Sequence, residues 1–469
     1  MVTAVRYATI LSATESSIMP ALTADLGRFV SELSLKDIPA AAQDVAKTGI
    51  SDCFGVMIAG SRDPAIDMLD RELAGADSPM QASLIPSLKK RNVEDAALVN
   101  GAAAHILDYD DVTLDGHPSA VLVPAIMAQG EVLHSSGAEL LTAYAAGYEV
   151  WVELLIREPV PLHQKGWHPT AVRGAVAAAA ACAKLQRLDP QKCQTAIAIA
   201  ASMTGGLVAN FGSLTKCFHV GRAAQSGVLA ARLAQAGLTA SPDALEHQSG
   251  FLAALSPTGE CDRSLPFSAK DKVWHLARQG LNLKRYPICY ATHRAIDAAL
   301  DLTNEYNLQP ADVAQIRVST GDMQMLMLRN DKPKTAFEAK FSMQFAMASS
   351  IVARGVGLSQ LTDEFVARAD VQDLFGKVKI ETTKETMNGS AFAPSESVEI
   401  RTAQGRLLSS APVVHAKGSM QRPLSRAELQ EKFIDCLGDQ LDSKAKSNSF
   451  EKLMNLERIN SASELLSLQ

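Results

Sequence analysis

Apolar residues recur at three- and four-residue spacing over the first part of the chain, from about Thr23 to Arg278. This period is that of helices with one buried face, and Gly, Pro or Asp residues separate successive runs. The pattern predicts helices over 38–60, 93–107, 139–156 and 171–185. The last, AVRGAVAAAAACAKL, is shorter than the ~20 residues of a membrane span and is expected to be a buried, alanine-rich helix.

The pattern changes after about residue 279. Four short segments rich in β-branched residues, 315–320, 379–383, 397–402 and 406–414, predict strands, and helical runs at 291–305 and 341–353 lie among them. A further helix is expected after Ser425, which precedes Glu428 by three residues as in a capping box. The fold class is therefore mainly α, with a large all-helical domain and a smaller α+β domain. We expect domain segments at 1–279, 280–415 and 416–469, the last returning to the first domain.

Length and composition agree with this division. A chain of 469 residues exceeds the roughly 250–300 residues at which one core stops growing. Aromatic residues make up only 5% of the chain while alanine is abundant, which favours closely packed helices over a β-sandwich. The net charge of -6, without a basic run, argues against nucleic acid as a partner.

Cysteine usage and the N-terminal stretch indicate the compartment. The seven cysteines are widely spread, with no CxxC spacing, which is typical of reduced thiols in a cytoplasmic protein and not of a disulfide framework or zinc site. The first residues lack a basic segment followed by a continuous apolar stretch and cleavage site. We therefore expect no export and no membrane span.

Two histidines occur where a loop meets a predicted helix. His117 lies in LDYDDVTLDGHPSAVLVPA, a loop crowded with aspartates, and carboxylates near an imidazole favour its protonated form. His168 lies in QKGWHPTAVRG, just before the alanine-rich helix, whose N-terminus is suited to an anion. The alternatives are a surface histidine beside helix-capping aspartates for His117 and a packed turn for His168.

Lys216 and His219 lie in the glycine-containing stretch TGGLVANFGSLTKCFHVGRAAQSG. Glycines let the backbone approach a ligand closely, but the GxxxxGK[ST] order of a phosphate loop is absent, which argues against a nucleotide site. A glycine-eased helix junction with Lys216 in solvent remains the alternative.

The segment KRYPICYATH brings together Lys284, Tyr286, Cys289 and His293 at the expected junction of the two domains. Clefts between domains are preferred ligand sites, although a solvated linker would have a similar composition. Cys289 and His293 supply only two ligands at four-residue spacing, so we expect no metal site.

Several of these motifs in this order resemble the MmgE/PrpD family, which includes 2-methylcitrate dehydratase, cis-aconitate decarboxylase and iminodisuccinate epimerase. The resemblance covers essentially the whole chain and rests on NGAAAHILDYDD, GHPSAVLVPA, GWHPTAV, GSLTKCFHVGRAAQSGVLAARLA, KRYPICYATH and EAKFSMQFA. It implies that the smaller domain is a lid inserted before the C-terminal helices. A homodimer and an active site between the domains, without metal or organic cofactor, are implied as well.

By motif match, the resemblance implies five catalytic positions, Asp108, His117, His168, Lys216 and Lys284, with His219, Tyr286, Cys289 and His293 expected to bind substrate. Some members carry a histidine five residues after the lysine, where this chain has Cys289. Lysines can hold carboxylates and histidines can exchange protons near neutral pH. The expected activity is therefore that of a lyase on a small di- or tricarboxylic acid, by decarboxylation or dehydration. An epimerase of a substituted succinate and a non-catalytic binding scaffold are the alternatives.

Overall fold

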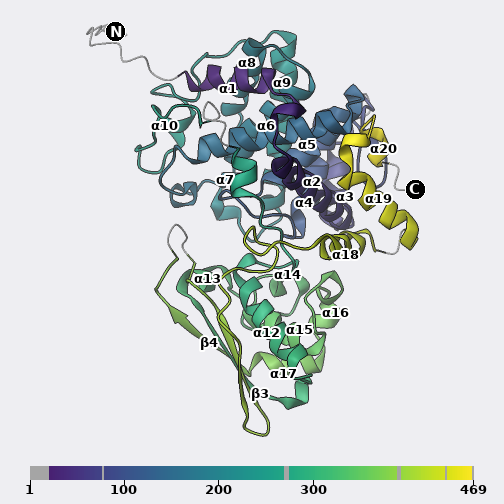
Figure 1. The fold of residues 1–469 in the computed structure, drawn as a ribbon, viewed down its shortest axis with the longest axis vertical. Helices are drawn as coiled ribbons and strands as arrows, with labels where there is room; N and C mark the ends of the chain where they lie inside the picture. The colour runs from purple at the N-terminus through teal and green to yellow at the C-terminus, as the bar shows by residue number, and fades with distance from the viewer. Residues whose placement is uncertain (1–20, 76–78, 269–273, 388–391, 439–440, 467–469) are drawn as a thin grey trace, which may run out of the picture.

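The computed structural model describes residues 21–75, 79–268, 274–387, 392–438 and 441–466. The chain forms two lobes, a larger one made of helices and a smaller one that combines helices with a sheet (Figure 1). Each lobe has its own large cluster of buried apolar side chains. The N-terminal stretch expected not to be an export signal lies at 1–20, outside the described residues.

The larger lobe is the helical domain. Its helices of eight residues or more in the N-terminal part are α1 (Leu22–Glu32), α2 (Ala40–Gly60), α3 (Pro64–Glu72), α4 (Val93–Ile106), α5 (Pro118–Leu133), α6 (Gly137–Leu155), α7 (Pro169–Leu185), α8 (Pro190–Ala201) and α9 (Thr215–Ala236). Short helices α10 (Phe251–Leu255) and α11 (His275–Gln279) follow, and a two-stranded hairpin joins β1 (Ala82–Ser83) to β2 (Lys90–Arg91). No helix in the described part of the chain is long and apolar enough to cross a membrane.

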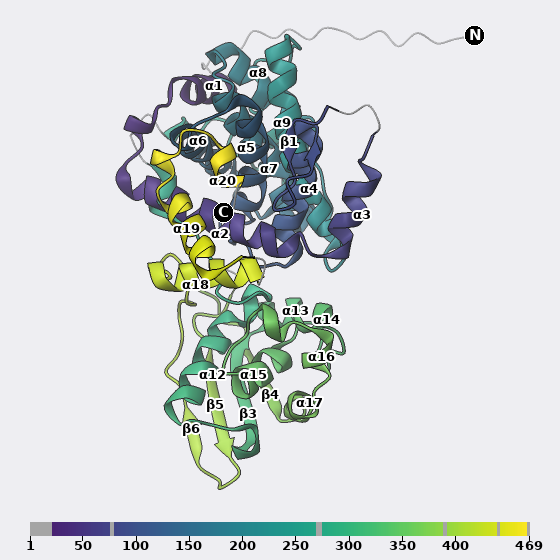
Figure 2. The same cartoon turned by 90° about the vertical axis from the view of Figure 1, so that its right-hand side faces the viewer.

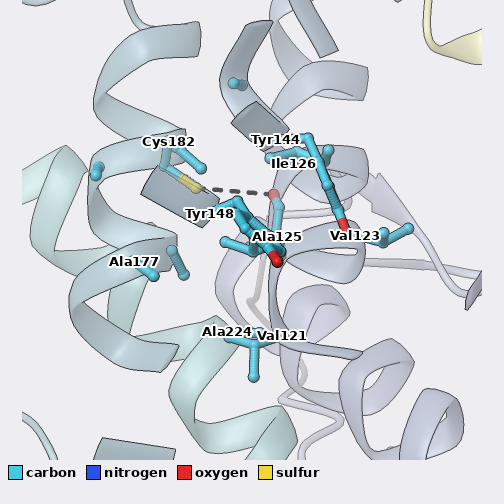
Figure 3. Close-up of a cluster of buried hydrophobic side chains, with 14 of the residues drawn as sticks. Val121, Val123, Ala125, Ile126, Tyr144, Tyr148, Ala177, Cys182 and Ala224 are labelled. Atoms are coloured by element: carbon cyan, nitrogen blue, oxygen red, sulfur yellow. Dashed lines mark hydrogen bonds between the residues drawn. The ribbon is translucent and has the colours of Figure 1, made fainter. Parts of the chain in front are cut away.

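Small residues allow the central helices to approach closely. Figure 3 shows side chains of α5, α6, α7 and α9 packed together, among them Ala125, Ala177 and Ala224. Gly221 of α9 lies directly against α4, because a Cβ atom at this position would come within 2.2 Å of the carbonyl oxygen of Leu98. The alanine and glycine content of the sequence therefore brings helix backbones together, and with them the residues at the helix ends.

The smaller lobe, the lid domain, contains α12 (His293–Glu305), α13 (Asp322–Met327), α14 (Ala336–Ala339), α15 (Met343–Val352), α16 (Asp363–Val366) and α17 (Ala369–Phe375). Its sheet has the order β4-β3-β5-β6, formed by β3 (Val313–Gly321), β4 (Val378–Thr383), β5 (Ser397–Thr402) and β6 (Leu407–Ser409). β3 pairs parallel to β4 and antiparallel to β5, with Ile316 opposite Val378 and Ile400. Helices α12, α15 and α17 lie on one side of this sheet (Figures 1 and 2).

The chain then returns to the helical domain through α18 (Arg426–Leu437), α19 (Ser443–Met454) and α20 (Ser463–Leu466). In Figure 2 these helices run from the junction of the lobes up along the larger lobe. Lys432 of α18 fixes this return, since its ammonium lies 2.7 Å from Asp52 of α2 and donates to the carbonyl oxygen of Tyr109 at 2.9 Å. α18 begins with the expected capping box of Ser425 and Glu428.

The expected fold class, mainly α with a smaller inserted α+β domain, is confirmed. The helices predicted from periodicity differ from the observed ones by one or two residues at most ends. The strand expected at 406–414 is shorter, because β6 covers only Leu407–Ser409 and Val413 forms an isolated bridge with Glu396. The expected residue boundaries of the domains stay predictions.

Candidate active site

Four helices of the helical domain end or begin at one place. Asp108 follows α4, His117 and His168 are the N-cap residues of α5 and α7, and Lys216 lies in the first turn of α9. Both histidines precede a proline at the first helical position, where its missing N–H costs no hydrogen bond. The packing of α4, α5, α7 and α9 against one another therefore gathers residues that are far apart in sequence.

Asp108 lies between two lysines. Lys216 Nζ is 3.1 Å from Oδ1 of Asp108, and Lys284 Nζ is 2.8 Å from Oδ2. Lys284 also donates to the backbone oxygen of Asp108 at 2.8 Å. Asp108 has a left-handed backbone with φ of 53°, a conformation that aspartate tolerates better than most residues.

The ionisation states of Asp108 and the lysines beside it depend on one another. Burial alone would raise the pKa of Asp108, but Lys216 and Lys284 outweigh burial and hold that pKa well below its ordinary value. Burial pushes the pKa of Lys216 down, but the carboxylates of Asp108 and Asp110 outweigh it and raise the pKa above its ordinary value. The carboxylate and the Lys216 ammonium therefore both stay charged at neutral pH.

A second buried carboxylate, Asp110, holds two imidazoles. His105 Nδ1 lies 3.0 and 2.9 Å from the two carboxylate oxygens, and His117 Nδ1 lies 3.0 Å from Oδ2. His117 Nδ1 also donates to the carbonyl oxygen of Asp111 at 2.8 Å. Each Nδ1 therefore carries a hydrogen, which leaves each Nε2 as the nitrogen not bound to Asp110.

His105 is a site residue that our sequence analysis did not select, although its motif was one of those that carry the resemblance. Burial lowers the pKa of His105 to about 4, against the opposing charge of Asp110, so the imidazole is neutral near pH 7. Its Nε2 has no hydrogen-bond partner among the described residues. The signal in the sequence was the five-residue spacing of His105 and Asp110, from the last turn of a helix to the loop that follows it.

His168 and His219 form a second imidazole pair, with their Nδ1 atoms 3.2 Å apart. Burial, followed by the charge of Lys216, lowers the pKa of His168 well below its ordinary value. Burial also lowers the pKa of His219. In a pair of neutral imidazoles, one Nδ1 donates to the other, so the two rings have different tautomers.

The structure brings only part of the KRYPICYATH segment to this cluster. Cys289 is buried within electrostatic reach of Asp108, Lys284 and Lys216, and burial, followed by the charge of Asp108, raises the pKa of its thiol. The hydroxyl of Tyr286 instead donates to Asp297 at 2.7 Å, and Tyr286 lines a separate cavity of about 390 Å³.

His293 lies on the same segment and packs against aromatic rings. Its ring centroid is 5.1 Å from that of Tyr286 and 4.9 Å from that of Tyr290. The Nε2 of His293 donates to the carbonyl oxygen of Ile288 at 3.2 Å. Burial lowers the pKa of His293 to about 3, so this ring is neutral and bonded to the backbone.

A small cavity of about 40 Å³ lies where the two domains meet. Both domains contribute to its lining, which includes His105, Asp108, Lys216, Phe337, Lys340 and Phe341. Such a volume holds a few water molecules, so the domains must separate locally before an organic acid can enter.

A metal site is conceivable here on geometry alone. Ligand atoms of His105, Asp108 and His117 lie within 4.8 Å of one another. However, the carboxylate of Asp108 is already bound by the ammonium groups of Lys216 and Lys284, which would repel a divalent cation. The residues therefore suit an anion better than a metal ion, and the expectation of no metal stays a prediction.

The fold and this site define a class of two-domain proteins in which helix ends carry a cationic, histidine-rich site beneath a smaller α+β lid. The chain belongs to the MmgE/PrpD family, whose N-terminal domain model matches residues 24–264 and whose C-terminal domain model matches residues 286–456. The family expected from the sequence motifs is thereby confirmed.

Relatives of known activity support the expectation of a lyase. The chain is 30% identical to the cis-aconitate decarboxylase of Homo sapiens over 80% of this chain and 78% of that protein. It is 32% identical to the cis-aconitate decarboxylase of Mus musculus, over 72% of this chain and 70% of the relative. The cis-aconitate decarboxylase of Aspergillus terreus is 24% identical over 97% of both chains.

Proposed function

We propose that this protein is a lyase that decarboxylates a small polycarboxylic acid of the cis-aconitate type, without a metal or organic cofactor. The observation that carries the proposal is the buried group of Asp108, Lys216 and Lys284 beside two imidazole pairs, at a cavity between the domains. The names of the relatives support the substrate class.

The charges of the site suit an acid with several carboxylates. Two ammonium groups face one carboxylate at Asp108, so this group keeps an excess positive charge. An ammonium that is shielded from water attracts a substrate carboxylate more strongly than an exposed one does. We therefore assign binding of the acid to Lys216 and Lys284, with Asp108 holding both lysines in place.

Decarboxylation needs stabilisation of an electron pair and then a proton. The bond from the departing carboxyl carbon breaks, CO2 leaves, and the neighbouring C=C bond passes the electron pair towards a remaining carboxylate. Fixed ammonium groups stabilise the charge that develops there. His117, carrying a second proton on Nε2 while its Nδ1–H stays on Asp110, then gives the Nε2 proton to the carbon, becomes a neutral imidazole and regains a proton from water.

Dehydration of a 2-methylcitrate-like acid and epimerisation of a substituted succinate such as iminodisuccinate need similar charge stabilisation. Incubation of the purified protein with cis-aconitate, 2-methylcitrate and iminodisuccinate in deuterated water, followed by NMR, separates the three reactions. We expect CO2 loss and one deuterium incorporated from cis-aconitate. Loss of water, or deuterium exchange alone, would replace this proposal by a dehydratase or an epimerase, and no turnover of any acid would favour a binding scaffold.

Assembly and compartment are part of the same proposal. We propose a homodimer in the cytoplasm that needs neither nucleic acid nor a membrane for its activity. All seven cysteines are free thiols and six of them are buried, which supports a reducing compartment. Light scattering coupled to gel filtration measures the mass of the assembly, and a monomer at micromolar concentration would contradict the dimer.

A further inference from the structure

Lys340 is a cationic residue of the cavity that has no role in the proposed decarboxylation. Lys340 follows the last residue of α14 and belongs to the motif EAKFSMQFA of the lid domain. It lines the cavity together with Asp108 and Lys216 of the helical domain. Lys340 is therefore a charged group that the lid contributes to a site built mainly by the other domain.

The contacts of Lys340 differ from those of the two lysines at Asp108. Its ammonium donates to the carbonyl oxygen of Ile106 at 3.3 Å, at the C-terminal end of α4. No carboxylate oxygen of the described residues lies within 4.0 Å of the Lys340 ammonium, so Lys340 forms no ion pair among them. Lys216 and Lys284, in contrast, both bind Asp108. An ammonium has three donors, so Lys340 keeps donors available for a further acceptor.

Burial makes this incomplete pairing costly. Removal from water lowers the pKa of Lys340, and the charge of Asp108 only partly opposes this effect. Even a partly buried charge without a close counter-ion costs folding free energy, and one long hydrogen bond to a helix carbonyl compensates it weakly. The ammonium of Lys340 thus lacks a carboxylate in direct contact, although the charges of Asp108 and Asp63 act on it from further away.

The backbone of Lys340 is hydrogen-bonded to the segment that carries Lys284 and Cys289. Its carbonyl oxygen accepts a hydrogen bond of 2.9 Å from the backbone N–H of Cys289, on the segment that also carries Lys284. The side chain therefore starts from a fixed point beside the cluster, and its ammonium needs little movement to reach an anion in a widened cavity.

We propose that Lys340 is a substrate-binding residue that receives one carboxylate of the acid and thereby makes the lid select tricarboxylic over dicarboxylic acids. This inference rests on the proposed function, because it requires a polycarboxylate in the cavity. Lys216 and Lys284 bind the acid from the helical domain, and Lys340 binds a further carboxylate from the lid. Closure of the lid on a tricarboxylate then completes the pairing of all three lysines.

The test measures binding of tricarballylate, a non-reacting tricarboxylate, and of glutarate, a dicarboxylate, by calorimetry. We compare the full-length wild type with Lys340→Met, Lys340→Gln and Lys340→Arg. A charged hydrogen bond contributes enough for its loss to weaken binding about 10- to 100-fold. We expect this loss for tricarballylate with Lys340→Met and Lys340→Gln, a change below about 3-fold for glutarate, and substantial recovery with Lys340→Arg.

Lys377→Met is the matched control. Lys377 is also a half-buried lysine of the lid whose ammonium donates to a backbone carbonyl, that of Val313 at 2.8 Å, but it does not line the cavity. This variant should bind both acids as the wild type does. Melting curves identify any variant that fails to fold. If either Lys340→Met or Lys340→Gln does not fold, the other still tests the loss of the charge.

The outcomes separate this inference from the proposed function. If the wild type binds tricarballylate and Lys340→Met or Lys340→Gln binds both acids equally well, the role of Lys340 is overturned while the proposed function stands. Equal losses for both acids would overturn the selection of tricarboxylates. If the wild type neither binds tricarballylate nor converts cis-aconitate, the proposed function fails and Lys340 has no such ligand.

Discussion

The two domains use charge in different ways. In the helical domain, opposite charges are paired in the interior, as in Asp52 with Lys432, whose side chains are 2% and 1% exposed. In the lid domain, Arg317 lies on the surface of the sheet beside Glu381 and Glu399, and its side chain is 40% exposed. The lid has a buried pair as well, Arg294 with Glu396 at 3.4 Å.

This difference indicates which domain carries the chemistry. Interior charges attract each other strongly but cost desolvation, so each depends on its partner. Exposed charges are screened by water and salt, so they depend little on one another. The helical domain therefore supplies fixed, mutually dependent groups at the site. The lid, apart from its buried pair of Arg294 and Glu396, supplies a cover that tolerates change except at the few positions that reach the cavity.

The largest expected effect is a loss of activity when one of the two lysines that bind Asp108 is replaced. Lys216→Met removes one of the two ammonium groups that stabilise charge in the proposed reaction, and we expect kcat/KM for cis-aconitate to fall about 1000-fold, or roughly 4 kcal/mol. Steady-state kinetics measures the loss, with circular dichroism to verify the fold. Lys192→Met, at a half-buried position of α8 that does not line the cavity, should keep wild-type activity, and an active Lys216→Met would remove Lys216 from the site.

A smaller effect, on stability, tests the close helix packing beneath the site. In Gly221→Ala the added methyl would lie 2.2 Å from the carbonyl oxygen of Leu98, so α4 and α9 must move apart. We expect a loss of about 3 kcal/mol in the free energy of unfolding, measured by urea denaturation. Activity should also fall, because these helices position Asp108 and Lys216.

Gly376→Ala in the lid is the matched control, since a Cβ there meets nothing within 4 Å. Its unfolding free energy should stay within about 0.5 kcal/mol of the wild type. Equal losses in the two variants would contradict the view that close backbone contact in the helical domain supports the site.

The sequence predicts the helices and part of the site, but not the contacts that loops make within the site. Helical periodicity and small-residue content predict the helices and their close packing, and motif order indicates Asp108 and Lys216. The separation of Tyr286 from the cluster could not be predicted, because neighbours in sequence can face different cavities when the chain turns at a domain junction. The sequence also does not predict that His105 and His117 both bind Asp110, since this contact depends on where a loop places one carboxylate between two helices.

A third prediction uses Asp111, which is 1% exposed and lies next to Asp110 in sequence. Burial, followed by the charge of Asp110, raises the pKa of Asp111 to about 8. The folded protein therefore keeps a proton that the unfolded chain releases near pH ~4. Since the native state binds more protons than the unfolded state over this range, the stability due to Asp111 is lost as pH rises from about 4 to about 8.

Asp111→Asn cannot ionise and should remove this loss. We expect its advantage in unfolding free energy over the wild type to grow by on the order of 3 kcal/mol from pH ~5 to pH ~7, because each pH unit between the two pKa values contributes about 1.4 kcal/mol. Denaturation curves across this pH range measure the difference. Asp373→Asn, at an exposed position of α17 in the lid, should keep the stability difference that the wild type shows between these pH values. A pH-independent difference for Asp111→Asn would contradict the raised pKa.

The smallest effect is expected on the surface of the lid sheet. Arg317 lies 3.2 Å from Glu381 and 3.0 Å from Glu399, and these three side chains are 40%, 61% and 31% exposed. Water screens such pairs, so Arg317→Ala should lower the unfolding free energy by less than about 1 kcal/mol. The difference should shrink further at about 1 M salt, where the screening length falls to roughly 3 Å. Activity should not change, because Arg317 does not line the cavity. A loss near 3 kcal/mol at high salt would mean that even the surface charges of the lid depend strongly on one another, and the contrast between the two domains would disappear.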